Sequence, residues 1–342
     1  NLTPYKAGEQ PRDKSYIKLN TNENPYLPTE SVTKYLNNVD VDKLRLYPDP
    51  TMTALRAELA GIHGLAPENI FAGNGSDEVL SFCFYAFFDK VIFPEFTYSF
   101  YPVYCDFYGI PYHRTPLRED YGIDLNKLLS MADDEAVIFA NPNSPTGMYL
   151  EPHEIEAFLR DFPKEKIVVV DEAYIDFGGR SCVDLLKSYL NLVVVRTFSK
   201  CHSLAGLRLG YCMASPQLIE SLFAVKDSFN SYPVSTLAQE LGLHALRDAD
   251  ANRANINLII ETRAKVSKEL SGTGWRVLPS KANFVFISKP GLSGEDVYST
   301  LKTKGILVRY FASPGLNDFV RVTIGTGDQM DAFIHAAADL KA

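Results

Sequence analysis

Short apolar runs that alternate with helical patterns constrain the fold of this chain more than any other feature. The runs are Val91–Phe93, Ala136–Ala140, Ile167–Val170, Leu192–Val195 and Leu209–Met213. Stretches with helical spacing, such as Glu151–Arg160, stand between them. Strands that alternate with helices form parallel sheets, and continuous apolar strands suit a sheet buried on both faces. The pattern therefore predicts an α/β fold with a mostly parallel sheet between helices.

The pattern changes near Asn252, which indicates a second and smaller domain. From Ile256 to Leu270, apolar residues recur at steps of three and four along one long helix. The elements expected after it are strands at Trp275–Leu278, Phe284–Ile287, Ile306–Val308 and Phe319–Ile324, and helices near Gly294–Leu301 and Asp328–Leu340. A length of 342 residues also exceeds the roughly 100–200 of an ordinary domain. We therefore expect a large α/β domain and a smaller α+β domain.

The first part of the chain is typical of an arm. Residues 1–30 contain four prolines and no sustained period, so we expect this segment to pack onto another part of the protein instead of folding alone. We place the arm at residues 1–29, on a partner subunit or on the small domain. The large domain is expected at residues 30–245 and the small domain at 246–342, although no linker marks a boundary near 230–250.

Composition and charge exclude several classes of function. The chain has 34 Lys and Arg against 42 Asp and Glu, and the net charge of −8 disfavours a nucleic-acid-binding surface. The longest apolar stretch, Leu80–Phe88, is about half of the roughly 20 residues that a membrane-spanning helix needs. No signal-like segment opens the chain, so we expect a cytoplasmic protein without membrane contact. Five cysteines without a CxxC pair and six scattered histidines predict reduced thiols and no metal site.

Polar residues that directly follow apolar strands mark the expected ligand site. In open parallel sheets, ligands bind in the crevice at the carboxyl ends of the strands. The polar segments at such positions are Gly73–Glu78, Asn141–Gly147, Asp171–Tyr174, and Thr197–Lys200 followed by Leu204–Arg208. These segments are therefore the first candidates for a functional site.

The glycine segment is a candidate phosphate cradle. Its two glycines allow a tight turn, and Ser76-Asp77-Glu78 opens a helical run whose free amides could bind an anion. GNGSDE lacks the third glycine of the dinucleotide fingerprint, and no GxxxxGK[ST] phosphate loop occurs in the chain. A plain turn in which Ser76 caps the helix is the alternative.

Asp171 and Lys200 are the candidate catalytic residues. Asp171 ends an Ile-Val-Val-Val run, where it could pair with the protonated ring nitrogen of a pyridine cofactor. A cap or a Walker B acid is the alternative, although no Walker A segment accompanies it. Lys200 lies on no evident solvated helix face, so partial burial could free its amine to form a Schiff base; an ordinary solvent-exposed lysine is the alternative. Arg208 and Ser199 could bind a phosphate, and Asn143 could contact a ring.

In their order and spacing, these motifs resemble those of fold-type I pyridoxal-phosphate enzymes, in particular the histidinol-phosphate aminotransferase family. The motifs that carry the resemblance are Leu2–Tyr5, Leu19–Tyr26, Tyr47–Pro50, Gly73–Glu78, Phe96–Ser99, Asn141–Gly147, Asp171–Tyr174 with Phe177, Ser199-Lys200 with Leu204–Tyr211, Arg309 and Arg321. The resemblance covers nearly the whole chain. It implies an aspartate-aminotransferase-like fold of type I and pyridoxal 5'-phosphate as the cofactor.

The resemblance also implies a role for each cofactor-site residue. Lys200 would hold the cofactor as a Schiff base and, once released, move the substrate proton. Asp171 would keep the pyridine nitrogen protonated. Asn143 and Tyr174 would bond the phenolic oxygen, and Tyr98 would stack on the ring. Tyr174 is thereby implied as a third catalytic residue beside Lys200 and Asp171. The residues implied around the phosphate are Gly75, Ser76, Asp77, Ser199 and Arg208. Asp77 would position its neighbours, because an ionised carboxylate cannot donate to an anion.

A homodimer with active sites at the subunit interface is a further implication. Tyr47 would reach the cofactor phosphate of the opposite subunit, and the arm with the substrate contacts Tyr5 and Asn22 would lie across the partner; a core tyrosine is the alternative for Tyr47. Arg321, on the polar face of an alternating strand, would bind a substrate carboxylate or phosphate. Arg309 would assist it. A surface ion pair is the alternative for either arginine.

The function implied is transamination between glutamate and imidazole-acetol phosphate, giving 2-oxoglutarate and histidinol phosphate in histidine synthesis by way of a quinonoid intermediate. Three alternatives stay open: an aromatic amino acid aminotransferase, a decarboxylase of phosphate-bearing amino acids, and a non-catalytic cofactor-binding protein. One departure from the family pattern is Cys201-His202-Ser203, which stands after Lys200 where an apolar pair is expected. It leaves the Schiff-base chemistry untouched and the contact beside the cofactor open.

Overall fold

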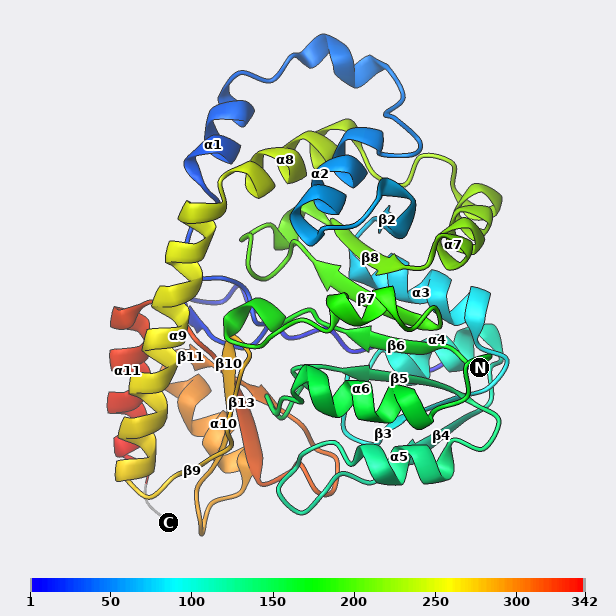
Figure 1. The fold of residues 1–342 in the computed structure, drawn as a ribbon. Helices are drawn as coiled ribbons and strands as arrows, with labels where there is room; N and C mark the ends of the chain where they lie inside the picture. The colour runs from blue at the N-terminus through cyan, green and yellow to red at the C-terminus, as the bar shows by residue number, and fades with distance from the viewer. Residues whose placement is uncertain (1, 341–342) are drawn as a thin grey trace.

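A computed structural model describes residues 2–340, so residue 1 of the expected arm and residues 341–342 of the expected small domain lie outside the described residues. Its centre is a seven-stranded sheet (Figure 1). In spatial order the strands are β2 (Ile70–Gly73), β8 (Gly210–Ala214), β7 (Leu192–Thr197), β6 (Val168–Asp171), β5 (Ala136–Ala140), β3 (Val91–Pro94) and β4 (Tyr112–Thr115). In this sheet β8 runs against both of its neighbours, and the other pairs are parallel. The prediction of a mostly parallel sheet is confirmed.

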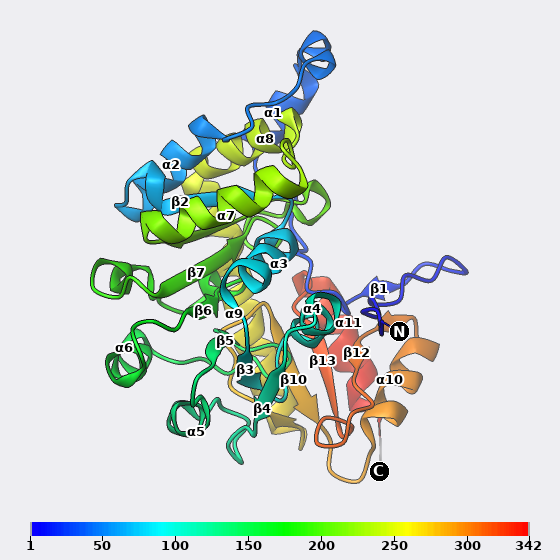
Figure 2. The same cartoon turned by 90° about the vertical axis from the view of Figure 1, so that its right-hand side faces the viewer.

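Helices cover both faces of this sheet. The helices against one face are α2 (Thr53–His63), α5 (Leu125–Met131), α6 (Pro152–Asp161) and α8 (Thr236–Arg247), with α1 (Glu30–Asn37) on α8. Those against the other face are α3 (Ser76–Phe87), α4 (Tyr101–Tyr108) and α7 (Pro216–Phe229). Figure 2 shows the two helical layers from the side.

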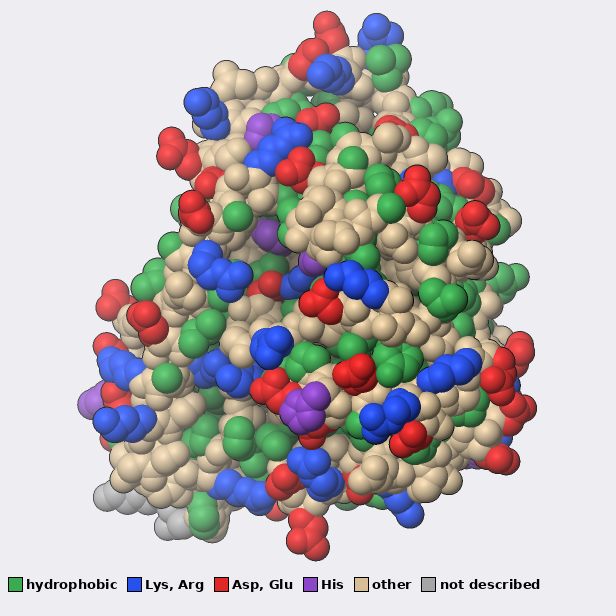
Figure 3. All heavy atoms as spheres, viewed as in Figure 1, with side chains coloured by type: hydrophobic (Ala, Val, Ile, Leu, Met, Phe, Trp, Pro, Cys, Tyr) green, Lys and Arg blue, Asp and Glu red, His purple; other side chains and the backbone are tan. Residues whose placement is uncertain are grey.

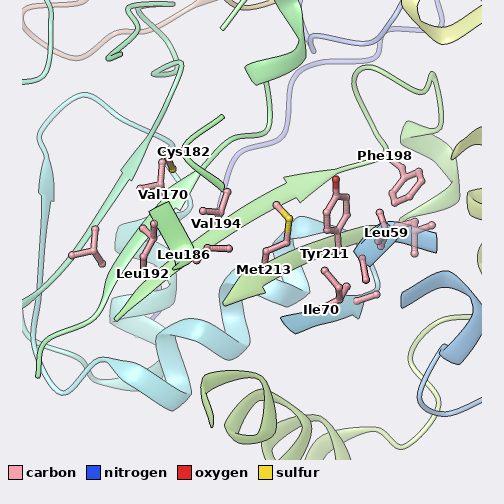
Figure 4. Packing of buried hydrophobic residues seen from close by; sticks show 14 of the residues in the cluster. Leu59, Ile70, Val170, Cys182, Leu186, Leu192, Val194, Phe198, Tyr211 and Met213 are labelled. Atoms are coloured by element: carbon pink, nitrogen blue, oxygen red, sulfur yellow. The ribbon is translucent and has the colours of Figure 1, made fainter. Parts of the chain in front are cut away.

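Side-chain alternation along the strands explains why the sheet is buried on both sides. Val168 and Val170 of β6 point into the core under α2, α5, α6 and α8, whereas Val169 points into the core under α3, α4 and α7. Figure 4 shows part of the first core, where Val170, Val194 and Met213 lie close together. Because both faces of the sheet are apolar, polar side chains occur at the ends of the strands.

The small domain is built around a second core. Its four-stranded antiparallel sheet has the order β12-β13-β10-β9. Its elements are α9 (Ala249–Gly272), β9 (Arg276–Val277), β10 (Phe284–Ser288), α10 (Gly294–Thr303), β11 (Ile306–Leu307), β12 (Arg309–Tyr310), β13 (Phe319–Thr323) and α11 (Gly327–Ala338). The long helix and the strands and helices expected after it are present, with ends shifted by a few residues. The expected domain limits stay a prediction.

The amino-terminal arm packs on the small domain of its own chain, whereas the resemblance placed it across a partner. Strand β1 (Ile17–Lys18) pairs in parallel with β11, and Leu19 is buried in the small-domain core. The physical reason is that the arm carries apolar side chains and free backbone groups, and the edge of β11 satisfies both. Of the two contacts expected for the arm, the structure shows the one with the small domain.

Charged side chains of both signs intermingle on the face of the molecule shown in Figure 3. Neither a basic stripe nor an acidic one is visible on that face. Among the helices of residues 2–340, none combines the length and the apolar character that crossing a membrane requires.

Two residues of α2 test the packing of the sheet. Leu59 is 0% exposed under the sheet, and Ile62 on the same helix is 53% exposed. Leu59→Ala should lower the free energy of unfolding by about 2–5 kcal/mol, because it removes buried methyl groups and leaves a cavity. Ile62→Ala should change it by less than about 0.5 kcal/mol. Urea denaturation measures both, and equal losses would contradict the packing described.

Candidate active site

The predicted polar segments meet around a cavity of about 390 Å³. The carboxyl ends of β5, β6 and β7 contribute Ala140, Asp171 and Thr197 to its lining. The predicted site residues that line it are Tyr5, Asn22, Ser76, Asp77, Tyr98, Asp171, Tyr174, Ser199, Lys200, Arg208, Arg309 and Arg321. The predicted residues outside its lining are Tyr47, Gly75 and Asn143. The crevice therefore lies where the ends of parallel strands were expected to place it.

Asp171 is a buried carboxylate that forms no ion pair among residues 2–340. Its Oδ2 accepts a hydrogen bond from the Tyr101 hydroxyl at 3.0 Å, and its Oδ1 accepts one from the Ala173 backbone N–H at 3.1 Å. Burial raises the pKa of this carboxyl to about 6, and the two hydrogen bonds only partly oppose the rise. A cationic group in the cavity would stabilise the ionised form, because burial penalises a charge that lacks a counter-charge.

Lys200 presents its amine to the same cavity from the loop after β7. Its Nζ donates to the carbonyl of Thr21 at 3.4 Å and lies 5.6 Å from the centre of the Tyr174 ring. The carbonyl of Lys200 accepts a hydrogen bond from the Asn24 side chain at 3.0 Å, so the arm fixes the backbone of this loop. Within the described residues the amine forms no ion pair, which leaves it available to react.

The beginning of α3 forms the end of the cavity that suits an anion. Ser76 is the first residue of the helix and Gly75, not Ser76, is its N-cap, which corrects the capping alternative for Ser76. The first amides of a helix lack partners within it and favour negative groups. Gly75 has φ +86°, and a Cβ there would lie 2.7 Å from Nη2 of Arg208. Glycine therefore allows the guanidinium to approach the helix start.

Asp77 organises this end of the cavity. One of its carboxylate oxygens accepts from the Tyr98 hydroxyl at 2.8 Å, and the other accepts from Nη2 of Arg208 at 2.8 Å. The hydroxyl of Tyr104 donates to the Asp77 backbone carbonyl. The carboxylate therefore orients Arg208 and Tyr98.

Asn22 lines the cavity of its own chain. Its side chain donates to the Tyr174 hydroxyl at 3.0 Å and accepts from the Thr323 hydroxyl at 3.0 Å. The side chain of Asn283 donates to the Asn22 backbone carbonyl. These hydrogen bonds join the arm to both domains. Tyr5 also lines the cavity of its own chain, and its ring lies 4.9 Å from that of Phe100.

Arg321 carries a half-buried guanidinium that has no carboxylate partner among the described residues. It donates to the Ser144 hydroxyl at 3.0 Å and to the Asn20 carbonyl at 3.2 Å, whereas its Nε has no partner in residues 2–340. Burial lowers the pKa of this guanidinium below its usual value. Arg309 donates to backbone carbonyls of the arm, those of Lys6 and Ala7, and its charge also acts on the carboxylate of Glu9. Two cationic groups thus line the cavity, and neither forms an ion pair with a carboxylate within residues 2–340.

Asn143 lies behind the cavity lining, and its neighbour Ser144 faces the cavity. The Asn143 amide nitrogen donates to the Phe96 carbonyl at 2.8 Å and to the Thr146 hydroxyl at 3.1 Å. Its Oδ1 has no partner in the described part of the chain. The hydrogen bonds of its amide nitrogen tie the Asn143 side chain to Phe96 and Thr146. Its expected contact with a cofactor ring stays a prediction.

Tyr47 lies on the surface, away from the cavity of its own chain. Tyr47 is 82% exposed. Its ring stacks on the ring of Tyr232, and the two ring centres are 4.6 Å apart. The alternative of a core tyrosine is therefore wrong. Its expected contact with the opposite subunit stays a prediction.

Comparison with known proteins assigns the family. The family model described as aminotransferase class I and II matches residues 14–336. The chain belongs to this aminotransferase family. The histidinol-phosphate aminotransferase of Syntrophus aciditrophicus (strain SB) is 56% identical to it over 335 residues, which are 96% of this chain and 93% of the relative. That of Brachyspira hyodysenteriae (strain ATCC 49526 / WA1) is 46% identical over 338 residues, 98% of this chain and 95% of the relative.

A solved structure supports the same assignment. The histidinol-phosphate aminotransferase from Sinorhizobium meliloti, in complex with pyridoxal-5'-phosphate, matches this aminotransferase with a TM-score of 0.87 at 25% identity. The match covers 95% of this chain and 90% of that chain. The prediction of the type I aminotransferase fold is therefore confirmed.

Sequence reasoning missed several residues of the aminotransferase site. Tyr101 bonds to Asp171, but it is one of 19 tyrosines and carries no motif of its own. Ser144 stands inside the motif Asn141–Gly147, so its position could have been considered beside Asn143. Thr21 contributes a backbone carbonyl to Lys200, and a carbonyl leaves no signal in a sequence.

The unusual residues after Lys200 belong to a network behind it. Asp176 forms an ion pair with Arg196 at 2.5 Å and accepts a hydrogen bond from the Cys201 thiol. Burial would raise the pKa of Asp176, but the Arg196 charge outweighs burial and lowers it to about 2. The ring of His202 packs 4.9 Å from that of Phe198, and burial lowers its pKa to about 4. Cys201 and His202 thus anchor the lysine loop from behind.

His202 makes the fold sensitive to acid. Its pKa is near 4 in the fold and about 6.5 when unfolded. Between these values the unfolded chain binds more protons, so the free energy of unfolding should fall as the pH decreases from about 6.5 to about 4. Each unit of difference between the two pKa values corresponds to about 1.4 kcal/mol of stability, and the partial exposure of His202 reduces its total contribution to about 2 kcal/mol. His202→Gln should remove this contribution, so the fall should be smaller by about 2 kcal/mol. Urea denaturation at several pH values measures it.

His153→Gln is the matched control for the loss of a histidine, because His153 lies on α6 away from this network. An acid-induced fall of equal size in the wild type and in His202→Gln would contradict the assignment.

Proposed function

We propose that this aminotransferase exchanges an amino group between glutamate or 2-oxoglutarate and histidinol phosphate or imidazole-acetol phosphate, with pyridoxal 5'-phosphate as cofactor. One observation carries the proposal: a single cavity holds the amine of Lys200, the buried carboxylate of Asp171 and the half-buried guanidinium of Arg321, and neither of these two charges has an ion-pair partner among residues 2–340. Relatives named for this activity, 46% and 56% identical over nearly the whole chain, support it.

The residues present fit this cofactor. Asp171 lacks a cationic partner among the described residues, and a protonated pyridine nitrogen is such a partner. The start of α3 and Arg208 offer donors to a phosphate, and Gly75 leaves room where a Cβ would collide with Arg208. Ser199 lines the cavity beside them. Tyr174 and Tyr98 present aromatic side chains to the space between these two ends.

Pyridoxal phosphate, once bound, supplies a ring that withdraws electrons from the substrate carbon that loses its proton. Asp171 would keep the ring nitrogen protonated by holding a negative charge beside it. Lys200 would anchor the cofactor covalently. Its Nζ, once released, would take the proton from that carbon and deliver it to the carbon on the other side of the amino nitrogen. Asn24 and the Cys201–Asp176 contact hold the lysine loop in place for this transfer.

Arg321 and Arg309 select the substrate in this proposal. A carboxylate of glutamate or the phosphate of histidinol phosphate would supply the negative charge that Arg321 lacks. Ser144 and the Asn20 carbonyl orient the guanidinium by accepting two of its N–H groups. The aromatic aminotransferase and decarboxylase alternatives are not favoured, because the named relatives share the phosphate-bearing substrate.

A homodimer is part of the proposal. Exposed apolar side chains gather on the short 3₁₀ helix Val41–Arg45 and the residues after it: Val41, Leu44, Leu46 and Tyr47. This segment projects from the body of the molecule in Figures 1 and 2. An exposed apolar group of this kind favours contact with another chain. A second copy would cover it and bring Tyr47 to the opposite cofactor site.

We also propose that the enzyme works in the cytoplasm. All five of its cysteines are free and buried. Free thiols are typical of a reducing compartment, which supports this location.

Lys200→Ala tests the covalent anchor. The variant should lose the visible absorption of the lysine-bound cofactor, and kcat should fall by at least about 10²–10⁴-fold, because both the anchor and the proton-transferring amine are gone. Lys187→Ala, at an exposed surface lysine, should keep both. An unchanged absorption band in Lys200→Ala would contradict the role of this lysine.

Substrate preference tests the activity. With 2-oxoglutarate as acceptor, kcat/KM for histidinol phosphate should exceed that for phenylalanine or tyrosine by at least about 100-fold. The reason is that a phosphate offers Arg321 and Arg309 more negative charge and more acceptor oxygens than a carboxylate does. Initial rates with the three donors measure this ratio. Equal or higher values for the unphosphorylated aromatics would move the enzyme to the aromatic aminotransferases, and release of carbon dioxide would support the decarboxylase alternative.

A further inference from the structure

Lys226 is a fully buried lysine that the proposed chemistry does not use. It lies near the end of α7 and is 0% exposed. Its Nζ donates to the Pro50 carbonyl at 3.1 Å and to the Ser231 carbonyl at 3.1 Å, and it forms an ion pair with Asp227 at 2.5 Å. Lysine is almost never fully buried without partners, because desolvating its charge costs free energy. Its contacts with Pro50, Ser231 and Asp227 therefore indicate which parts of the chain the buried ammonium group holds in place.

The two carbonyls belong to the segments that carry Tyr47 and Tyr232. Pro50 follows Tyr47 by three residues, and Ser231 directly precedes Tyr232. Gln239 of α8 ties the same two segments, because its side-chain nitrogen donates to the Asp49 carbonyl at 2.9 Å and to the Val234 carbonyl at 3.0 Å. Lys226 and Gln239 thus bridge two segments that are about 180 residues apart in the chain.

The bridge holds two tyrosine rings together in an exposed place. The rings of Tyr47 and Tyr232 lie 4.6 Å apart with an angle of 19° between their planes. Neither ring lines the cavity of its own chain. Tyr47 is also the more exposed of the two, at 82% against 41%. A stacked pair that is fixed from behind and faces outward is preorganised for contact with another molecule.

The segment before the bridge is fixed as well. Asp49 accepts hydrogen bonds from the backbone of Thr51 and Thr53 at the start of α2. The position of Pro50 is therefore determined both by α2 and by Lys226.

We propose that Lys226 is a positioning residue that acts on the active site of the other subunit, by holding the Tyr47–Tyr232 pair in the orientation that completes that site. The inference rests on the proposed function, in which Tyr47 reaches the opposite cofactor. The alternative is that Lys226 only stabilises the chain in which it lies. The two differ in which subunit's site fails when the lysine is replaced.

Lys226→Met removes the ammonium group and keeps a long apolar side chain. The homodimer of this variant should bind pyridoxal phosphate more weakly, and its kcat/KM should fall by about 10–100-fold, because the tyrosine pair loses its fixed position. Lys187→Met, at an exposed lysine, is the matched control and should keep wild-type values. Wild-type cofactor affinity and turnover in Lys226→Met would overturn the proposal.

A heterodimer separates the two explanations. Chains carrying Lys226→Met and Lys200→Ala, with different affinity tags, are expressed together and the heterodimer is purified. In one of its sites the Lys226→Met chain supplies Lys200, and the Lys200→Ala chain supplies an intact tyrosine pair. We expect about half of wild-type kcat/KM, far above the value of either homodimer. A heterodimer no more active than the Lys226→Met homodimer would show that the lysine acts only within its own chain.

The heterodimer of Lys187→Met with Lys200→Ala gives the reference value of one working site. If Lys226→Met does not fold, Gln239→Ala replaces it, since Gln239 ties the same two segments, and the same rescue is expected. The rates are measured with whichever amino donor the wild type turns over fastest. If the proposed substrate is wrong, a different amino donor will give the fastest rate. If Lys226 does not act on the other subunit, the heterodimer will not regain activity with any donor.

Discussion

A sheet that is buried on both faces leaves only the ends of its strands for polar chemistry, and the rest of the site depends on this constraint. The helices on either side of β5, β6 and β7 cover the apolar side chains along these strands up to the cavity, which Ala140 lines. The first polar residue after β5, the last residue of β6 and the loop after β7 therefore reach one edge together. Asp171 and Lys200 meet there although 29 positions separate them in the chain.

The site holds charges that the protein does not neutralise itself. Asp171 on the large domain has no cation, and Arg321 on the small domain has no carboxylate, among residues 2–340. Burying either charge costs free energy, so each group would be better paired or replaced if stability alone mattered. Complementary charges on a cofactor and a substrate would recover that cost on binding. By contrast, the structural charges nearby, Asp176 and Arg196, are paired with each other.

The sequence predicts those features that arise from local pattern, and it does not predict those that depend on packing. Continuous apolar runs predicted the strands, and polar residues after them predicted Asp171 and Lys200 as site residues. Which of Asn143 and Ser144 faces the cavity depends on hydrogen bonds inside their loop, so spacing could not decide it. The burial of Lys226 depends on two distant segments that fold against α7. The arm packs on its own chain because the edge of β11 is free, which no local pattern reveals.

The protonation state of the bound cofactor tests the central claim, that Asp171 is a buried negative charge kept for a cationic partner. The measurement is the nitrogen-15 chemical shift of ring-labelled pyridoxal phosphate bound to the wild type and to Asp171→Asn, which keeps the size of the side chain and removes its charge. We expect a protonated ring nitrogen in the wild type and an unprotonated one in the variant. The same protonation state in both proteins would contradict it.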